Sequence, residues 1–106
     1  MYTRIVECTV KPDQKDDFRN AIATQVLPLV RNQNGFVELW GLLSDEISDH
    51  ALVVTLWKSK EDAERFYRQR APMVDILKPF CAKAPGVEHY YLDTSATHRI
   101  ALGRAA

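Results

Sequence analysis

Trp57, Tyr67 and Arg70 are the side chains whose types and spacing could do chemistry. Trp57 ends an apolar stretch, and Tyr67 and Arg70 follow it in a segment with helical spacing. An indole can form the wall of a site for a flat ring and donate its N–H. A phenol hydroxyl can donate to developing oxyanion charge, and an arginine can pair with an anionic oxygen. This set would suit the binding of a flat aromatic ring that carries an oxygen.

Each of these residues also has a purely structural interpretation. A tryptophan on a strand next to a helix is most often part of the core, so packing alone could explain Trp57. Tyr67 could be a core-edge residue with its hydroxyl in water. Arg70 could belong with Arg65 and Arg68 to a solvated helix face.

Glu7 and His89 are the acid–base candidates on strands. His89 could titrate near neutrality and act as a base, although solvent exposure or a hydrogen bond at a subunit interface would also explain it. Trp40 could be a second aromatic wall, or could pack at a dimer interface. The candidates for substrate binding are Thr55, Phe66, Met73, Trp40 and His89.

Metal, nucleotide and hydrolase motifs are absent from the sequence. Cys8 and Cys81 are far apart in apolar surroundings, so we expect buried free thiols. There is no CxxC or Cys/His spacing, no phosphate-binding glycine loop, no EF-hand spacing and no Ser/His/Asp set. The sequence therefore suggests neither a metal site nor a redox pair of cysteines.

Length and charge limit the class of protein. A chain of 106 residues forms one domain. Lys plus Arg equals Asp plus Glu at 14 each, without a basic run, which argues against nucleic acid or an anionic membrane as the main partner. The apolar runs are too short to span a bilayer. No charged segment followed by an apolar core precedes the first strand, so we expect a cytoplasmic protein.

The first half of the chain alternates in a strand over 2–11, with Val6, Cys8 and Val10 on one side. Acidic residues and a three- and four-residue apolar spacing then predict a helix to about Asn34, ended by Gly35. Pro28 should kink that helix, because proline removes one backbone hydrogen bond. Two strands, over 36–43 and 50–58, follow and are close enough to form a hairpin.

Both faces of the third strand are apolar, with Leu52, Val54 and Leu56 on one face and Val53 and Trp57 on the other. Helices on one side of a sheet would leave one of these two apolar faces exposed to water. A second subunit covering the other face is the simplest resolution.

The third strand runs directly into a second helix. Ser59 is a good N-cap, and Asp62 suits a capping box. Trp57 must therefore lie close to the first apolar turn of this helix. Ala71-Pro72 should break the helix, and a further helical piece over 72–82 and a fourth strand over 87–92 complete the pattern.

The order strand, helix, strand, strand, helix, strand predicts an α+β, ferredoxin-like domain with an antiparallel sheet and both helices on one face. We assign residues 1–93 to this domain. Residues 94–106 are small and polar, and we expect a tail that is mobile or docked on a partner subunit.

Over residues 3–92 the sequence resembles the antibiotic biosynthesis monooxygenase (ABM) domains, with the Trp-x-Ser corner the most specific piece. The motifs are Lys11-Pro-Asp, Leu27-Pro-Leu-Val, Asn34-Gly-Phe and Leu56-Trp-Lys-Ser-Lys-Glu-Asp-Ala. The resemblance implies a dimeric α+β barrel whose two sheets meet face to face. It also implies a ligand cavity between sheet and helices in each subunit.

The family carries two chemistries. Haem-degrading members need an Asn, a Trp and a His, and the resemblance places these at about Val6, Phe66 and Ile76. None matches, and residues 59–85 contain no His. Other members oxidise polycyclic phenols or quinols with O2 without metal or flavin, through a Trp with Asn, Tyr and Arg side chains. Trp57 matches that Trp, but Val53 stands where the Asn is expected.

The leading hypothesis is a homodimeric, cofactor-independent monooxygenase acting on a small aromatic phenol or quinol with O2. In it, Trp57, Tyr67 and Arg70 are the catalytic candidates. The alternative is a non-catalytic module on the same scaffold that binds a small molecule or serves in a stress response. The missing Asn and the absence of a committed acid–base group motivate this alternative.

Overall fold

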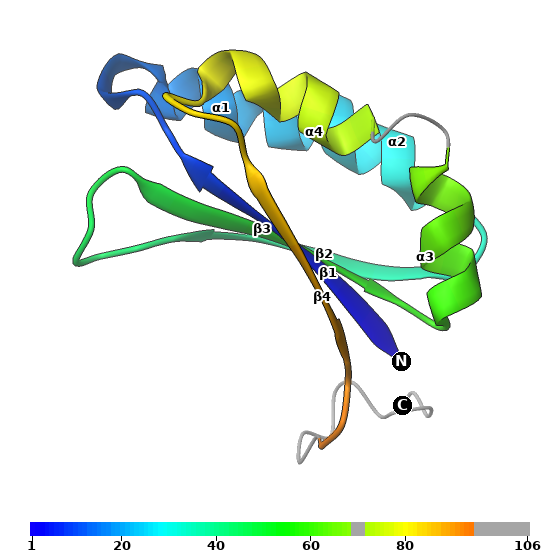
Figure 1. The fold of residues 1–106 in the computed structure, drawn as a ribbon. Coiled ribbons are helices and arrows are strands. Elements are labelled where there is room, and N and C mark those ends of the chain that lie inside the picture. The colour runs from blue at the N-terminus through cyan, green and yellow to red at the C-terminus, as the bar shows by residue number, and fades with distance from the viewer. Residues whose placement is uncertain (69–71, 95–106) are drawn as a thin grey trace.

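The computed structural model describes residues 1–68 and 72–94. Four antiparallel strands form one sheet in the order β2-β3-β1-β4, and the helices lie together on one side of it (Figure 1). This confirms the α+β ferredoxin-like fold. The strands are β1 (Tyr2–Thr9), β2 (Phe36–Leu43), β3 (His50–Trp57) and β4 (Gly86–Tyr91).

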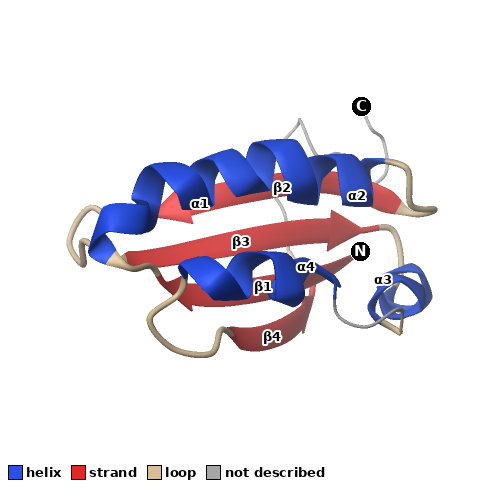
Figure 2. Cartoon of the chain, turned by 90° about the horizontal axis from the view of Figure 1, so that it is seen from above, coloured by secondary structure: helices blue, strands red, loops and turns tan. Residues whose placement is uncertain are grey.

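Seen from above, α1 and α2 follow β2, α4 lies over the middle of the sheet, and α3 stands at one end (Figure 2). The 94–106 tail and the break at Ala71 fall outside the described residues, apart from Thr94 and Pro72. None of the helices in the described ranges is long and apolar enough to cross a bilayer. The helices are α1 (Lys15–Ala21), α2 (Leu27–Arg31), α3 (Lys60–Tyr67) and α4 (Pro72–Leu77), and a 3-10 turn (Lys78–Phe80) follows α4.

The irregularity expected at Pro28 is a π-helical turn, Ile22–Val26, between α1 and α2. The Leu27 N–H donates to the Ile22 carbonyl, which lies one residue further back than in an α-helix. Pro28 has no N–H to donate, so the wider turn is accommodated just before it. The helix ends at Arg31, earlier than the expected Asn34, and Gly35 has the predicted positive φ, at 84°.

The two faces of the sheet differ in what covers them. Residues at even positions of β1, such as Val6 and Cys8, are buried under the helices, as are Val53 and Trp57 of β3. The opposite face, which we call the open face, has no helix over it in the described part of the chain (Figure 1). By strand register the open face carries Ile5, Trp40, Leu42, Val54 and Tyr90.

The junction from β3 to α3 is held by the predicted N-cap at Ser59. The Asp62 N–H donates to Ser59 Oγ at 3.1 Å, and Ser59 Oγ donates to Asp62 Oδ2 at 3.0 Å. Arg65 donates to Asp62 Oδ1 at 2.8 Å, and the hydrogen bonds from Arg65 and Ser59 lower the pKa of Asp62. Gly35 packs against this cap, because a Cβ on Gly35 would overlap the Asp62 side chain. The first turn of α3 is thus fixed in place.

Candidate functional site

Trp57 lies on the helix side of the sheet and is fully buried. As expected from the short junction, its ring contacts Phe66 of α3, with ring centroids 5.4 Å apart, and Tyr67, at 6.3 Å. Phe36 packs against another edge at 5.8 Å. The indole N–H donates to Thr55 Oγ1 at 3.0 Å. The indole N–H is therefore already hydrogen-bonded within the protein, and the Trp57 ring packs against the ring of Tyr67.

Arg4 lies against Tyr67 on the same side of the sheet. The guanidinium carbon is 3.3 Å from the centroid of the Tyr67 ring, a cation–π contact. Arg4 is only 5% exposed, and among the described residues its Nε and Nη1 atoms and the Tyr67 hydroxyl have no hydrogen-bond partner. Burial lowers the pKa of Arg4 and raises the pKa of Tyr67. Arg4 and Tyr67 thus place three buried polar atoms without a hydrogen-bond partner beside one another.

His89 of β4 stands opposite Arg4 in the β1–β4 register. The centroid of its ring lies 5.8 Å from that of Tyr67 and 5.9 Å from that of Tyr2. His89 is exposed, as is all of β4, and its limited desolvation and then the Arg4 charge lower its pKa from the ordinary histidine value. The lowered pKa favours the neutral form of the imidazole.

Several of these side chains line a shallow, largely open depression of about 350 Å³, which we call the Arg4 cavity. Its volume falls at the lower end of the range for small-molecule sites. The lining combines two cations, a carboxylate, an aromatic ring and an imidazole, so it suits a polar ligand. Its lining residues are Arg4, Glu64, Tyr67, Arg68 and His89.

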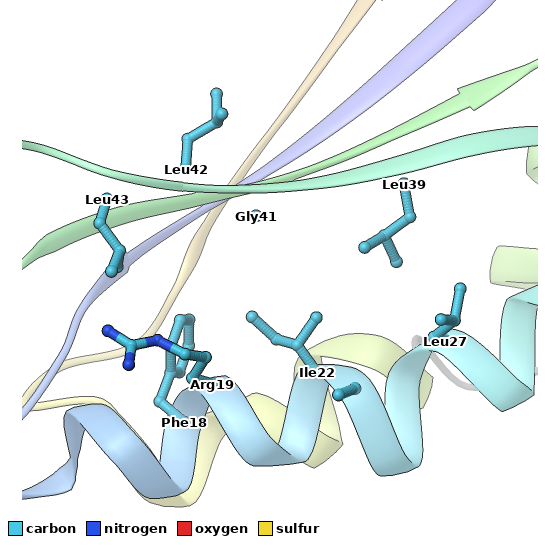
Figure 3. A pocket seen from close by; sticks show the side chains of 9 residues that line it. Phe18, Arg19, Ile22, Leu27, Leu39, Gly41, Leu42 and Leu43 are labelled. Atoms are coloured by element: carbon cyan, nitrogen blue, oxygen red, sulfur yellow. The ribbon is translucent and has the colours of Figure 1, made fainter.

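A second cavity, of about 360 Å³, lies between the first helix and β2 (Figure 3). We call it the β2 cavity. Side chains such as Ile22 and Leu39 point into it, whereas Leu42 points to the other face of the sheet. Gly41 contributes to this space because it has no side chain there, and the sequence reasoning did not predict it. The β2 cavity can hold an apolar group but offers no acid–base pair. Its lining residues are Phe18, Arg19, Ile22, Ala23, Leu27, Leu39, Gly41, Leu42 and Leu43.

The structure brings together only some of the site residues predicted from sequence. Tyr67 and His89 line the Arg4 cavity, with Thr55, Trp57 and Phe66 packed behind Tyr67. The remaining three lie elsewhere or are not described: Met73 is buried in the core, Trp40 pairs with Val54 and so faces the open side, and Arg70 lies outside the described residues.

Arg4 is the functional candidate that sequence reasoning missed. The signal was present, because Arg4 falls in the alternating set of Tyr2, Val6 and Cys8 that forms the buried face of β1. A charged residue in such a set must be paired, ligand-bound or at an edge. Within residues 1–68 and 72–94, no group of three His, Cys, Asp or Glu side chains could hold a metal ion.

Comparison with known proteins places this geometry in context. Residues 1–78 match the family model described as "Antibiotic biosynthesis monooxygenase". No curated protein matches the chain. Solved structures share the fold at low sequence identity. A likeness of this kind establishes the fold but not the function.

Three of these structures have TM-scores near 0.75. SnoaB, a cofactor-independent oxygenase from Streptomyces nogalater, was solved as a mutant; it has 15% identity and a TM-score of 0.76, covering 90% of this chain and 95% of its own. ActVA-Orf6, a monooxygenase from Streptomyces coelicolor solved with nanaomycin D, has 13% identity and a TM-score of 0.75, covering 91% and 90%. A Bordetella bronchiseptica protein with the same family description has 22% identity and a TM-score of 0.74, covering 88% and 97%.

Proposed function

This chain belongs to the antibiotic biosynthesis monooxygenase family, and on that premise we propose that it oxidises a small aromatic phenol or quinol with O2, without a cofactor. The description of SnoaB as a cofactor-independent oxygenase supports this chemistry for the fold. The observation that carries the proposal for this chain is that Tyr67 and His89 line one cavity, with the buried Trp57 cluster packed against Tyr67.

In the proposed reaction the reduced substrate supplies the electrons. One atom of O2 becomes a carbonyl oxygen at a ring carbon that carried one hydrogen, and the other atom leaves as water with that hydrogen and the phenolic hydrogen, so that the phenol becomes a quinone. The protein binds and orients the ring and removes a proton, since a phenolate gives up an electron more readily than a phenol.

The roles of the side chains follow from their positions. The imidazole of His89 accepts the phenolic proton, and the ring of Tyr67, whose hydroxyl is itself buried, forms a wall of the site. Trp57 and Phe66 hold the Tyr67 ring in place. Arg70 stays in the proposal as a second cation from the family resemblance.

We further propose that two copies form a cytoplasmic homodimer through their open faces. Leu42 and Tyr90 are 49% and 48% exposed there, beside the apolar Ile5, Trp40 and Val54. A face of this composition is stabilised by covering it. A monomer in light scattering at micromolar concentration would contradict this arrangement.

Oxygen uptake tests the activity. The purified protein, without added metal, should consume O2 with at least one member of a panel of hydroquinones and anthrone-like compounds. His89→Gln removes the proposed base and should lower kcat, whereas Tyr91→Phe changes an exposed side chain that lines neither cavity and should not. No uptake across the panel would sink the proposal.

A non-catalytic binding module is the second candidate. It is favoured by one observation, that Val53 is fully buried core where the polycyclic-oxidising members have an Asn. Trp57→Phe separates the two functions. Lost turnover with retained binding indicates an enzyme, whereas a change of affinity alone, with no turnover in the parent protein, indicates a binder.

A further inference from the structure

The β2 cavity is separate from the proposed active site and has no part in the proposed reaction. It has a volume of about 360 Å³ and shares no lining residue with the Arg4 cavity. Its lining is apolar apart from the side chain of Arg19. Small-molecule sites commonly have this volume, with mostly apolar walls and a few polar groups that fix the orientation of the ligand.

Gly41 keeps this space open although the strand does not need a glycine there. Glycine inside a strand weakens the strand, because it loses more chain entropy on folding and has no side chain to pack. Among the described residues only Gly35 is a glycine with a positive φ, so the backbone at position 41 would accept another residue. A Cβ on Gly41 would meet only Ile22 Cδ1, at 3.8 Å. The effect of the glycine is therefore empty volume.

The wall opposite Gly41 is the π-helical turn. Ile22 and Ala23 belong to this turn and line the cavity. Turns of this kind are rare and frequently lie at functional sites. Pro28 explains why the helix widens at this place, but not why a glycine lies across from it. Two locally unfavourable features therefore face each other across one space (Figure 3).

The cavity extends along β2 (Figure 3). Arg19 and Leu43 lie at one end of it. Leu27 and Leu39 lie at the other end. The walls are mainly aliphatic, since Phe18, the one aromatic residue among the described lining, is only 2% exposed. Such a space suits an alkyl chain, which buries apolar surface and needs no hydrogen-bond partner inside.

Arg19 favours an anionic group at the end of that chain. Among the described residues that line the cavity, Arg19 alone is charged. Its ion pair with Asp16 is a surface contact at 3.4 Å between side chains that are 64% and 96% exposed, so it contributes little. A guanidinium carries five N–H donors. Arg19 can therefore bind a carboxylate of a ligand at the same time.

We propose that the β2 cavity binds an aliphatic carboxylic acid of medium chain length, with its alkyl chain between β2 and the π-helical turn and its carboxylate on Arg19. This site is additional to the proposed active site, and the inference does not depend on the proposed function. A second copy docked on the open face would leave the cavity accessible, because the cavity lies between β2 and the first helix.

The first experiment varies the ligand. Titration calorimetry with straight-chain carboxylates from butanoate to octanoate should show binding that tightens by about three- to fourfold for each added methylene. Octanoate and the uncharged octanamide have the same chain and test the polar end. Octanoate should bind more tightly by about 1.5- to fivefold, the range expected for an exposed ion pair.

The second experiment fills the cavity. Gly41→Leu adds a side chain from the strand, and Ile22→Phe adds volume from the helix. Each should weaken octanoate binding by about tenfold or more, which corresponds to the loss of roughly two buried methylenes. Gln25→Leu adds an apolar side chain at an exposed position of the same helical turn that lines neither cavity, and should bind like the parent protein.

The third experiment removes the charge. Arg19→Met should abolish the preference for octanoate over octanamide. Arg31→Met, at an exposed position of α2 that lines neither cavity, should retain it. Circular dichroism identifies any variant that does not fold, and the comparison of ligands on the parent protein stands without the variants.

Affinity that does not depend on chain length, or no saturable binding of any probe, would overturn the inference. So would octanoate binding that is unchanged in a folded Gly41→Leu or Ile22→Phe protein, because the chain would then lie elsewhere on the surface. An anion preference that survives in a folded Arg19→Met protein would overturn the placement of the carboxylate. None of these measurements involves oxygen uptake, so their outcome is separable from that of the proposed function.

Discussion

Gly35→Ala should destabilise the corner that carries Tyr67. Gly35 has φ of 84°, where an L side chain is strained, and a Cβ there would overlap the Asp62 side chain in the α3 cap. The main chain cannot easily move away, because the Lys58 N–H donates to the Gly35 carbonyl at 2.8 Å. The substitution therefore acts on the backbone of one segment and on the cap of another.

The magnitude is the sum of two contributions. Holding alanine in the left-handed region costs about 1 kcal/mol or slightly more. Displacing Asp62 disturbs its hydrogen bonds with Ser59, and the loss of an N-cap typically costs about 1 kcal/mol. The exposed Arg65–Asp62 pair adds little. We expect the free energy of unfolding to fall by roughly 2 kcal/mol.

Urea denaturation followed by tryptophan fluorescence measures this loss, at one protein concentration because the apparent stability of a dimer depends on it. Gly41→Ala is the matched control. A Cβ there would meet only Ile22 Cδ1, at 3.8 Å, an ordinary contact. If both substitutions change the free energy of unfolding equally, within about 0.5 kcal/mol, the explanation given for Gly35 is refuted.

Three further predictions concern Thr55, Cys8 and His89. Thr55→Val removes the acceptor of the Trp57 indole N–H and should cost about 1–3 kcal/mol in the same urea experiment; an unchanged midpoint would show that the bond contributes nothing. Burial raises the pKa of the Cys8 thiol to about 12, so iodoacetamide should label Cys8 in urea but not in the native protein, and rapid native labelling would contradict this. The pKa of His89 is lowered by burial and by Arg4, so NMR should place its titration midpoint below the ordinary histidine value, and Arg4→Met should raise it in part. As pH falls through the ordinary histidine range the unfolded state takes up the proton first, so His89 should reduce stability there; an ordinary midpoint that is insensitive to Arg4→Met would refute both statements.

The local elements of the fold could be predicted from the sequence because their causes lie within a few residues. Ser59 and Asp62 form the cap from side chains three positions apart, and Gly35 ends its segment through its own φ. Pro28 marks the place where the helix changes its hydrogen bonding. The alternation in β1 likewise predicted which residues share a face. The order of strands and helices then predicted a ferredoxin-like antiparallel sheet.

The candidate site could be predicted only in part from the sequence. The Trp57 corner was found because the strand and helix that form it are adjacent in the chain. Arg4 and His89 are separated by most of the sequence, and only the β1–β4 register sets them opposite each other. The lowered pKa of His89 depends in part on that meeting, because the Arg4 charge contributes to it.

The sequence by itself therefore determined the elements, their faces and the corner at Trp57. Tertiary structure alone decided that the guanidinium of Arg4 lies on Tyr67, that it lacks an acceptor in the described chain, and that space stays open beside it and beside Gly41. The physical reason is that periodicity assigns a side chain to a face, whereas burial, pairing and empty volume depend on side chains that distant segments bring to the same place.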